Sequence, residues 1–137
     1  PRRRRAVVAP GLHFRSSHHR IMVGRTAADN DELLRSHVAG NDYWFHARDW
    51  PGAYVFVKTL KGKSVPLEVM LDAANLAVFY SKGRSAGSGD VYYTQVKFLR
   101  RARGGRTGLV IPTHEKNLFV RLDAGRVERV RQSQVVE

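Results

Sequence analysis

The sequence predicts an α+β fold in which a mixed, mostly antiparallel sheet packs on one long central helix and one shorter helix. Two patterns support this expectation. Apolar residues recur at helical spacing over residues 66–82, and β-branched and aromatic residues dominate residues 53–58 and 91–101. A chain of 137 residues has room for one domain with one core.

The shorter helix is expected over residues 29–39, within TAADNDELLRSHVAG. Asp29 suits the N-cap position, and Gly40 suits a left-handed position just after the last turn. The preceding residues, 21–23, are expected to form a short strand that ends at Gly24.

The second half of the chain alternates turn signals and apolar runs. Pro66 suits the first turn of the long helix, and the loop SKGRSAGSGD follows that helix. VYYTQVKFLRR, residues 91–101, has the clearest strand alternation. GLVI and NLFVRL are expected to pair as a hairpin across PTHEKN.

The chain is therefore divided into three parts. Residues 1–20 are expected to be a basic flexible lead followed by irregular structure or an edge strand. Residues 21–125 form the domain, and residues 126–137 form a polar tail that frays. The first residue is Pro1 rather than methionine, which is consistent with a processed start or with a domain excised from a longer protein.

The charge favours a polyanionic partner. The net charge is +12, from 24 Lys+Arg against 12 Asp+Glu. Removing the arginines of residues 2–5 still leaves an excess, so the basic character belongs to the whole chain. The sequence has no cysteine, which excludes disulfides and thiolate sites and is compatible with a reducing cytoplasm. We expect no membrane span, because no apolar run approaches about 18 residues.

The stretch NDYWFHARDWPG, residues 41–52, carries the candidate site. If residues 42–48 are extended, Tyr43 and Phe45 point to one face. The opposite face then carries a chemically mixed set: Asp42, Trp44, His46 and Arg48. Two interpretations remain open from periodicity. The mixed face is a platform on which Trp44 stacks on a nucleobase, or Trp44 belongs to the core and Asp42 merely begins a strand.

Basic residues elsewhere predict phosphate contacts. Residues 97–106 hold five cations and no acid, which indicates either a phosphate-contact ridge or a solvated hairpin tip. Gly24 and Arg25 precede a helix start, where backbone N–H groups attract anions. Lys82 and Arg84 lie in the loop after the long helix.

Residues 24–122 resemble the NFACT-R domain, the RNA-binding module of proteins related to fibronectin-binding protein A, Tae2, Caliban and nuclear export mediator factor. The matching blocks are VGRTAADNDEL, DYWFHARDWPG, DAANLAVFYSKGR and VYYTQVKFLRR. The chain departs from the family pattern at two positions: Thr26 stands where Asn is usual, and Tyr54 where His is usual.

The resemblance implies a role for the family's Asp/Trp/His signature, which falls on Asp42, Trp44 and His46, with Gly24 and Arg25 beside it. It also implies RNA binding linked to translation and ribosome-associated quality control, with tRNA, large-subunit ribosomal RNA or the 50S subunit as partner.

We therefore predict a non-catalytic RNA-binding module that uses no cofactor and no metal. The predicted RNA contacts are Gly24, Arg25, Asn30, Asp42, Trp44, His46, Arg48, Lys82, Arg84, Lys97, Arg100, Arg101 and Arg103. One alternative is a metal-dependent hydrolase or nuclease that uses Asp42 and His46. Another is a basic scaffold that docks on an acidic protein or a membrane.

Overall fold

The structure is a computed structural model that describes residues 9–102, 104 and 107–136. Its main sheet has the strand order β1-β2-β4-β3-β5-β8, and every neighbouring pair is antiparallel. These strands are β1 (Leu12–Ser16), β2 (His19–Gly24), β3 (Tyr43–Ala47), β4 (Tyr54–Val57), β5 (Ser88–Gln95) and β8 (Lys116–Arg121). A separate hairpin joins β6 (Leu99–Arg101) to β7 (Val110–Pro112).

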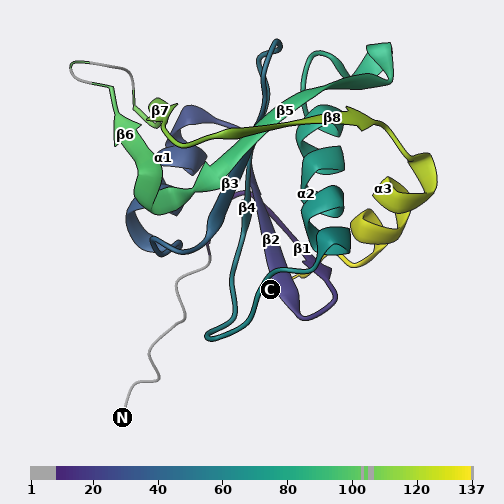
Figure 1. Ribbon diagram of the computed structural model, residues 1–137, viewed down its shortest axis with the longest axis horizontal. Helices are drawn as coiled ribbons and strands as arrows, with labels where there is room; N and C mark the ends of the chain where they lie inside the picture. The colour runs from purple at the N-terminus through teal and green to yellow at the C-terminus, as the bar shows by residue number, and fades with distance from the viewer. Residues whose placement is uncertain (1–8, 103, 105–106, 137) are drawn as a thin grey trace.

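The helices are α1 (Ala27–Ser36), α2 (Leu67–Phe79) and α3 (Ala124–Gln132), with two 3₁₀ turns at Arg84–Ala86 (η1) and Val96–Phe98 (η2). Figure 1 shows α2 along one side of the sheet with α3 beside it, and α1 with the β6–β7 hairpin on the other side. The predicted α+β class is confirmed.

The central strands β3 and β4 are buried on both faces of the sheet. Phe45, Val55 and Leu76 belong to the core between the sheet and α2. Trp44 and Phe56 belong to a second core on the opposite face. Alternating side chains of β3 and β4 therefore contribute to two different cores, as strand geometry requires.

Both predicted main helices are present, but their ends differ from the prediction. Thr26, not Asp29, caps α1, because its side chain accepts a hydrogen bond from the Asp29 N–H at 3.0 Å. The C-cap of α1 is His37, so the left-handed C-cap predicted at Gly40 is wrong. Pro66 is the N-cap of α2, which ends at Phe79 rather than at residue 82.

The strand expected over residues 91–101 is interrupted. The 3₁₀ turn η2 separates β5 from β6, so the two segments join different sheets. The hairpin predicted between GLVI and NLFVRL is wrong. β7 pairs with β6, and β8 pairs with β5 along the edge of the main sheet.

The two ends of the described chain both pack on the domain. The arginines of residues 2–5 lie outside the described residues, but β1 is an edge strand of the main sheet, which matches the edge-strand alternative and starts the sheet before residue 21. Much of the segment expected as a fraying tail is α3, whose Val127 and Val130 are buried.

Asp72 on α2 holds α3 against the central helix through hydrogen bonds to two arginines of α3. This buried carboxylate accepts hydrogen bonds from Arg126 at 2.8 Å, Arg129 at 2.6 Å and Ser16 at 2.5 Å. Burying a charge is costly unless partners satisfy it. Asp72 therefore binds α3 and β1 to the central helix.

Candidate nucleic-acid interface

Asp42 immediately precedes β3 and is 2% exposed. Its Oδ1 accepts hydrogen bonds from the backbone N–H of Thr59 at 2.8 Å and from the Thr59 hydroxyl at 3.0 Å. Its Oδ2 accepts hydrogen bonds from the Ala39 N–H at 2.8 Å and from Lys58 Nζ at 2.6 Å. Both oxygens are therefore engaged within the protein.

The environment of Asp42 keeps it ionised. Burial alone raises the pKa of this carboxyl, but the hydrogen bonds from Ala39, Lys58 and Thr59 outweigh that effect and hold the pKa below its ordinary value. Asp42 thus joins the loop after α1 to the end of β4. The predicted direct contact between its carboxylate and an RNA hydroxyl or amine would require breaking these bonds.

Trp44 does not face solvent. It is 1% exposed and packs in the second core with Leu33, Tyr54 and Phe56. The Tyr54 ring lies edge-on to it, with ring centroids 5.3 Å apart. The interpretation in which Trp44 is an exposed stacking platform is wrong. Strand alternation placed it on the correct face, but α1 and the β6–β7 hairpin cover that face.

His46 continues the same aromatic cluster. Its ring stacks on Trp44 at 5.8 Å and meets Tyr54 edge-on at 5.2 Å. Burial is the main reason that the pKa of His46 is lowered, and a contact with the Gly52 backbone opposes it. The imidazole is therefore neutral at neutral pH. Burial likewise raises the pKa of Tyr54 and of Tyr92, which lies beside His46.

An accessible hollow lies just beyond His46, where the β3–β4 turn meets the end of α2. Arg25 and Lys82, both predicted RNA contacts, line it together with Pro51, Gly52 and Tyr80. The turn is fixed in place because the Lys82 N–H donates to the Pro51 carbonyl at 2.9 Å and the Ala53 N–H donates to the Tyr80 carbonyl at 3.1 Å. Two cations from distant segments thus meet on a rigid support.

Trp50 projects beside this hollow and is 43% exposed. Its ring lies on Gly83: a Cβ at that glycine would come within 2.3 Å of Trp50 Cδ1. The sequence assigned this tryptophan only to the turn next to Pro51. The structure makes it the exposed aromatic of the segment, and its position beside a Pro-Gly turn was the available signal.

Two further predicted contacts lie in neighbouring segments of the chain: Arg48 directly follows β3, and Arg84 begins η1, two residues after Lys82. Arg48 is exposed and donates to the side chain of Asn117 at 3.3 Å. The Arg84 guanidinium covers the Phe79 ring at 3.6 Å from its centroid. We call this group the basic rim, and it consists of Arg25, Arg48, Trp50, Lys82 and Arg84.

Gly24 and Asn30, two further predicted RNA contacts, lie at the contact between β2 and α1 and are not part of the basic rim. Gly24 is buried at the end of β2, and a Cβ there would lie 2.1 Å from Asn30 Oδ1. The close approach between α1 and β2 therefore requires glycine. Asn30 Oδ1 is buried and has no hydrogen-bond partner among the described residues.

The predicted basic ridge is a separate group on η2 and β6. Lys97 donates to Asn41 Oδ1 at 3.2 Å, and Arg100 is exposed. Arg101 pairs with Asp31 of α1 at 2.5 Å. Hydrogen bonds from Arg35 first and Arg101 second hold the pKa of Asp31 below its ordinary value. Arg103 and Arg106 lie outside the described residues.

Within residues 9–102, 104 and 107–136, no cluster of three or more His, Asp or Glu side chains could hold a metal ion. No helix in the described part of the chain is long and apolar enough to cross a membrane.

Comparison with protein families matches residues 12–111 to the NFACT protein RNA binding domain. The chain belongs to this family. Among curated relatives of this NFACT RNA-binding domain, Rqc2 homolog RqcH of Streptococcus pneumoniae is 35% identical over 114 residues, which is 82% of this chain and 20% of the relative. The Bacillus subtilis Rqc2 homolog RqcH is 27% identical over 113 residues, 82% of this chain and 19% of the relative. The chain thus spans about a fifth of these relatives.

Two other similarities extend the comparison. The Coiled-coil domain-containing protein 25 homolog of Dictyostelium discoideum is 26% identical over 120 residues, covering 80% of this chain and 58% of the relative. Among solved structures, the C-terminal part of the fibronectin/fibrinogen-binding protein from Streptococcus suis superposes with a TM-score of 0.79 at 27% identity. That match covers 94% of this chain and 52% of the other.

The two departures from the NFACT-R pattern have structural roles. Thr26 caps α1 through its hydroxyl. Tyr54 is buried in the second core, and its hydroxyl accepts a hydrogen bond from the Val110 N–H at 3.3 Å, which attaches the β6–β7 hairpin to the sheet.

Proposed function

We propose that this NFACT RNA-binding domain binds single-stranded or unpaired RNA through the basic rim. Trp50 stacks on an exposed base, while Arg25, Arg48, Lys82 and Arg84 contact the neighbouring phosphates. Unpaired bases commonly stack on aromatic side chains, and cations follow the backbone. The observation that carries the proposal is a half-exposed Trp50 beside a hollow lined by Arg25 and Lys82.

The charges of the rim are available for such contacts. Among the described residues, no salt bridge involves Arg25, Lys82 or Arg84, whereas Arg101 of the ridge already pairs with Asp31. Four phosphate contacts on a single strand correspond to a log–log salt slope of about −3, at roughly −0.7 per contact. The basic ridge then contributes longer-range attraction.

The biological setting is part of the same proposal. Relatives that contain this domain are named Rqc2 homologs, and the resemblance stated above links such proteins to ribosome-associated quality control. We assign the domain the role of an RNA contact in that process, with tRNA or large-subunit ribosomal RNA as ligand. Crosslinking in cells followed by sequencing of the recovered RNA distinguishes these two ligands.

The hydrolase alternative has weaker support. Each oxygen of Asp42 already accepts two hydrogen bonds, and Lys58 is one of the four donors. His46 packs in an aromatic cluster with Trp44 and Tyr54. A general base or metal ligand needs a lone pair that can reach the substrate or ion. This arrangement offers none at Asp42 without local rearrangement.

The test is Trp50→Ala, with Phe119→Ala as matched control. Phe119 is 58% exposed on the edge strand β8, so it controls for loss of any exposed aromatic. Loss of one base stack corresponds to about 1–3 kcal/mol, or roughly a 5- to 150-fold weaker affinity for single-stranded RNA. Fluorescence anisotropy at several salt concentrations measures it. Equal affinities of the two variants would refute the stacking role.

A further inference from the structure

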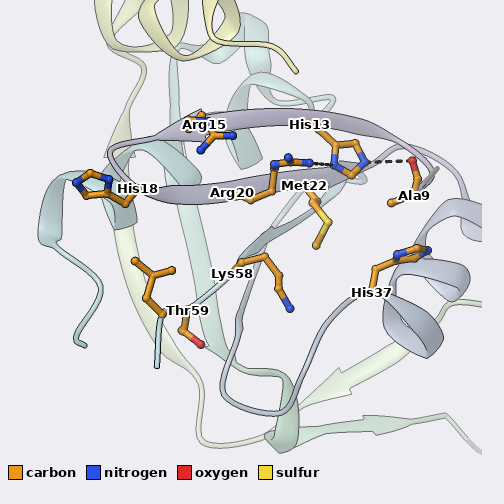
Figure 2. Close-up of a pocket in the computed structure, with 10 residues that line it drawn as sticks. Ala9, His13, Arg15, His18, Arg20, Met22, His37, Lys58 and Thr59 are labelled. Atoms are coloured by element: carbon orange, nitrogen blue, oxygen red, sulfur yellow. Dashed lines mark hydrogen bonds between the residues drawn. The ribbon is translucent and has the colours of Figure 1, made fainter. Parts of the chain in front are cut away.

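A second basic hollow lies on the face of the sheet opposite α2. It has a volume of about 470 Å³ and is lined by residues from β1, β2, the end of β4 and the end of α1. The lining residues with cationic or imidazole side chains are His13, Arg15, His18, Arg20, His37 and Lys58. Figure 2 shows Arg15 and Arg20 on adjacent strands, His18 at the hairpin turn and His37 on the helix across from them.

Strand register brings three cations side by side. Arg15 of β1 is directly opposite Arg20 of β2, and the Lys58 N–H donates to the Arg20 carbonyl at 3.0 Å. Alternation puts Phe14 and Ser16 on the other face, toward α2.

Neighbouring side chains hold Arg20 and Lys58 in place. His13 Nε2 lies 3.1 Å from the carbonyl oxygens of Ala9 and Pro10, which can only accept, so Nε2 carries the proton. His13 Nδ1 therefore accepts the hydrogen bond from Arg20 Nη1 at 3.2 Å. Lys58 Nζ forms an ion pair with the buried Asp42 carboxylate at 2.6 Å, so its charge is already balanced within the protein. Cations fixed before binding lose less entropy when a ligand arrives.

The described residues that line this hollow include no Asp or Glu. Arginine and lysine together are the residues that recognise phosphate oxygens, arginine through its planar fork and lysine as a point charge. The volume of about 470 Å³ is larger than a single phosphate group. The chemistry of the hollow matches a phosphate group in a polynucleotide chain.

We propose that this hollow binds a backbone phosphate of RNA at a second site, separate from the basic rim. The inference rests on the proposed RNA-binding function and adds a second contact to it. β2 and β4 each extend from this hollow toward the rim, from Arg20 to Arg25 and from Lys58 to Ala53. Five residues at about 3.3 Å each correspond to roughly 16 Å. One RNA segment must therefore extend over several nucleotides to occupy both sites.

The first test needs no substitution. Imidazole NMR signals of the full chain are followed during titration with a long single-stranded RNA and, separately, with inorganic phosphate. His13, His18 and His37 line the hollow, while His114 packs on Phe98 of η2 and reports on the basic ridge instead. RNA is expected to shift the signals of the three lining histidines. RNA binding without such shifts overturns this inference but leaves the rim intact, whereas absence of any RNA binding overturns the proposed function itself.

The second test compares Arg15→Gln with Arg121→Gln. Both arginines are exposed, and Arg121 lies on the opposite edge strand of the same sheet, so each variant loses one charge. The Arg15 backbone bonds to Ser133 do not involve the guanidinium, so the fold is preserved. Arg15→Gln is expected to weaken RNA binding several-fold and to reduce the salt slope by about 0.7, with little change for Arg121→Gln.

Two outcomes count against the second site. Equal effects of the two arginine variants mean that Arg15 acts only through net charge. Histidine shifts produced by inorganic phosphate but not by RNA mean that the hollow receives a small free anion instead of a polynucleotide.

Discussion

Replacing Asp42 with asparagine separates a structural role from direct RNA contact. The side-chain shape is kept, but the charge is lost and one oxygen becomes an NH₂ group. Each Asp42 oxygen accepts two hydrogen bonds, so either orientation of the amide loses two of them. Hydrogen bonds to charged groups contribute about 1.5–3 kcal/mol each. Lys58 is 34% exposed, so water can replace the hydrogen bond that it loses, and this reduces the total loss of stability.

We therefore expect Asp42→Asn to reduce the free energy of unfolding by about 2–4 kcal/mol, a large part of the roughly 5–15 kcal/mol typical of a domain. Such a loss corresponds to a melting temperature lower by about 10 °C. Urea unfolding followed by tryptophan fluorescence measures it. Asp49→Asn is the matched control, because Asp49 is exposed, and we expect a change within about 0.5 kcal/mol.

The pH dependence gives a further check. The folded-state pKa of Asp42 is below its ordinary value of 3.8, so its contribution is complete above that pH and is lost as the pH falls through the folded pKa. The stability difference between the wild type and Asp42→Asn should narrow in strong acid. If folded Asp42→Asn loses RNA affinity with no loss of stability, Asp42 contacts the ligand and our assignment is wrong.

Three other changes test the site. Trp44→Ala is expected to cost about 3–5 kcal/mol of stability but to leave the RNA affinity of the folded fraction unchanged, and a selective loss of affinity would restore the stacking interpretation. Gly83→Ala places a Cβ 2.3 Å from Trp50 Cδ1, so it should displace that ring and weaken RNA binding, with Gly89→Ala as a comparison where the nearest atom is 3.9 Å away. His46 has a lowered pKa, so the unfolded chain binds more protons just below pH 6.5, and stability should rise with pH in that window by up to about 1.4 kcal/mol per unit. Urea titrations at several pH values should show that the free energy of unfolding rises less steeply with pH in His46→Gln than in the wild type. An equal slope would mean that His46 does not cause the rise.

Local patterns predicted the elements whose sequence carries its own signal. The alternation around Tyr43 and Phe45 and the apolar repeat of residues 66–82 indicated β3 and α2. The same alternation placed Trp44 on the other face of the sheet. It could not reveal that α1 and the β6–β7 hairpin bury that face, because the covering elements come from distant parts of the chain.

The wrong predictions all involve contacts between residues that are far apart in the sequence. α3 has only Val127 and Val130 as buried residues in a strongly charged segment, so its sequence resembles a solvated tail. Its docking depends on Asp72, more than 50 residues away. The pairing of β8 with β5 likewise replaces the nearer partner, β7. The sequence predicted the cations of the basic rim one by one and not as a group. Arg25 and Lys82 are far apart in the sequence and line the same hollow only in the folded chain.

The docking of α3 also places the two ends of the described domain side by side. The Val135 N–H donates to the His13 carbonyl at 2.8 Å, and Ser133 bonds to Arg15. Domains with adjacent termini tolerate insertion into host loops and circular permutation. A permutant that joins these ends and opens the exposed turn at residues 61–64 should fold. The same geometry would let this domain be inserted as an independent unit into a longer polypeptide without rearranging the proposed RNA-binding surface.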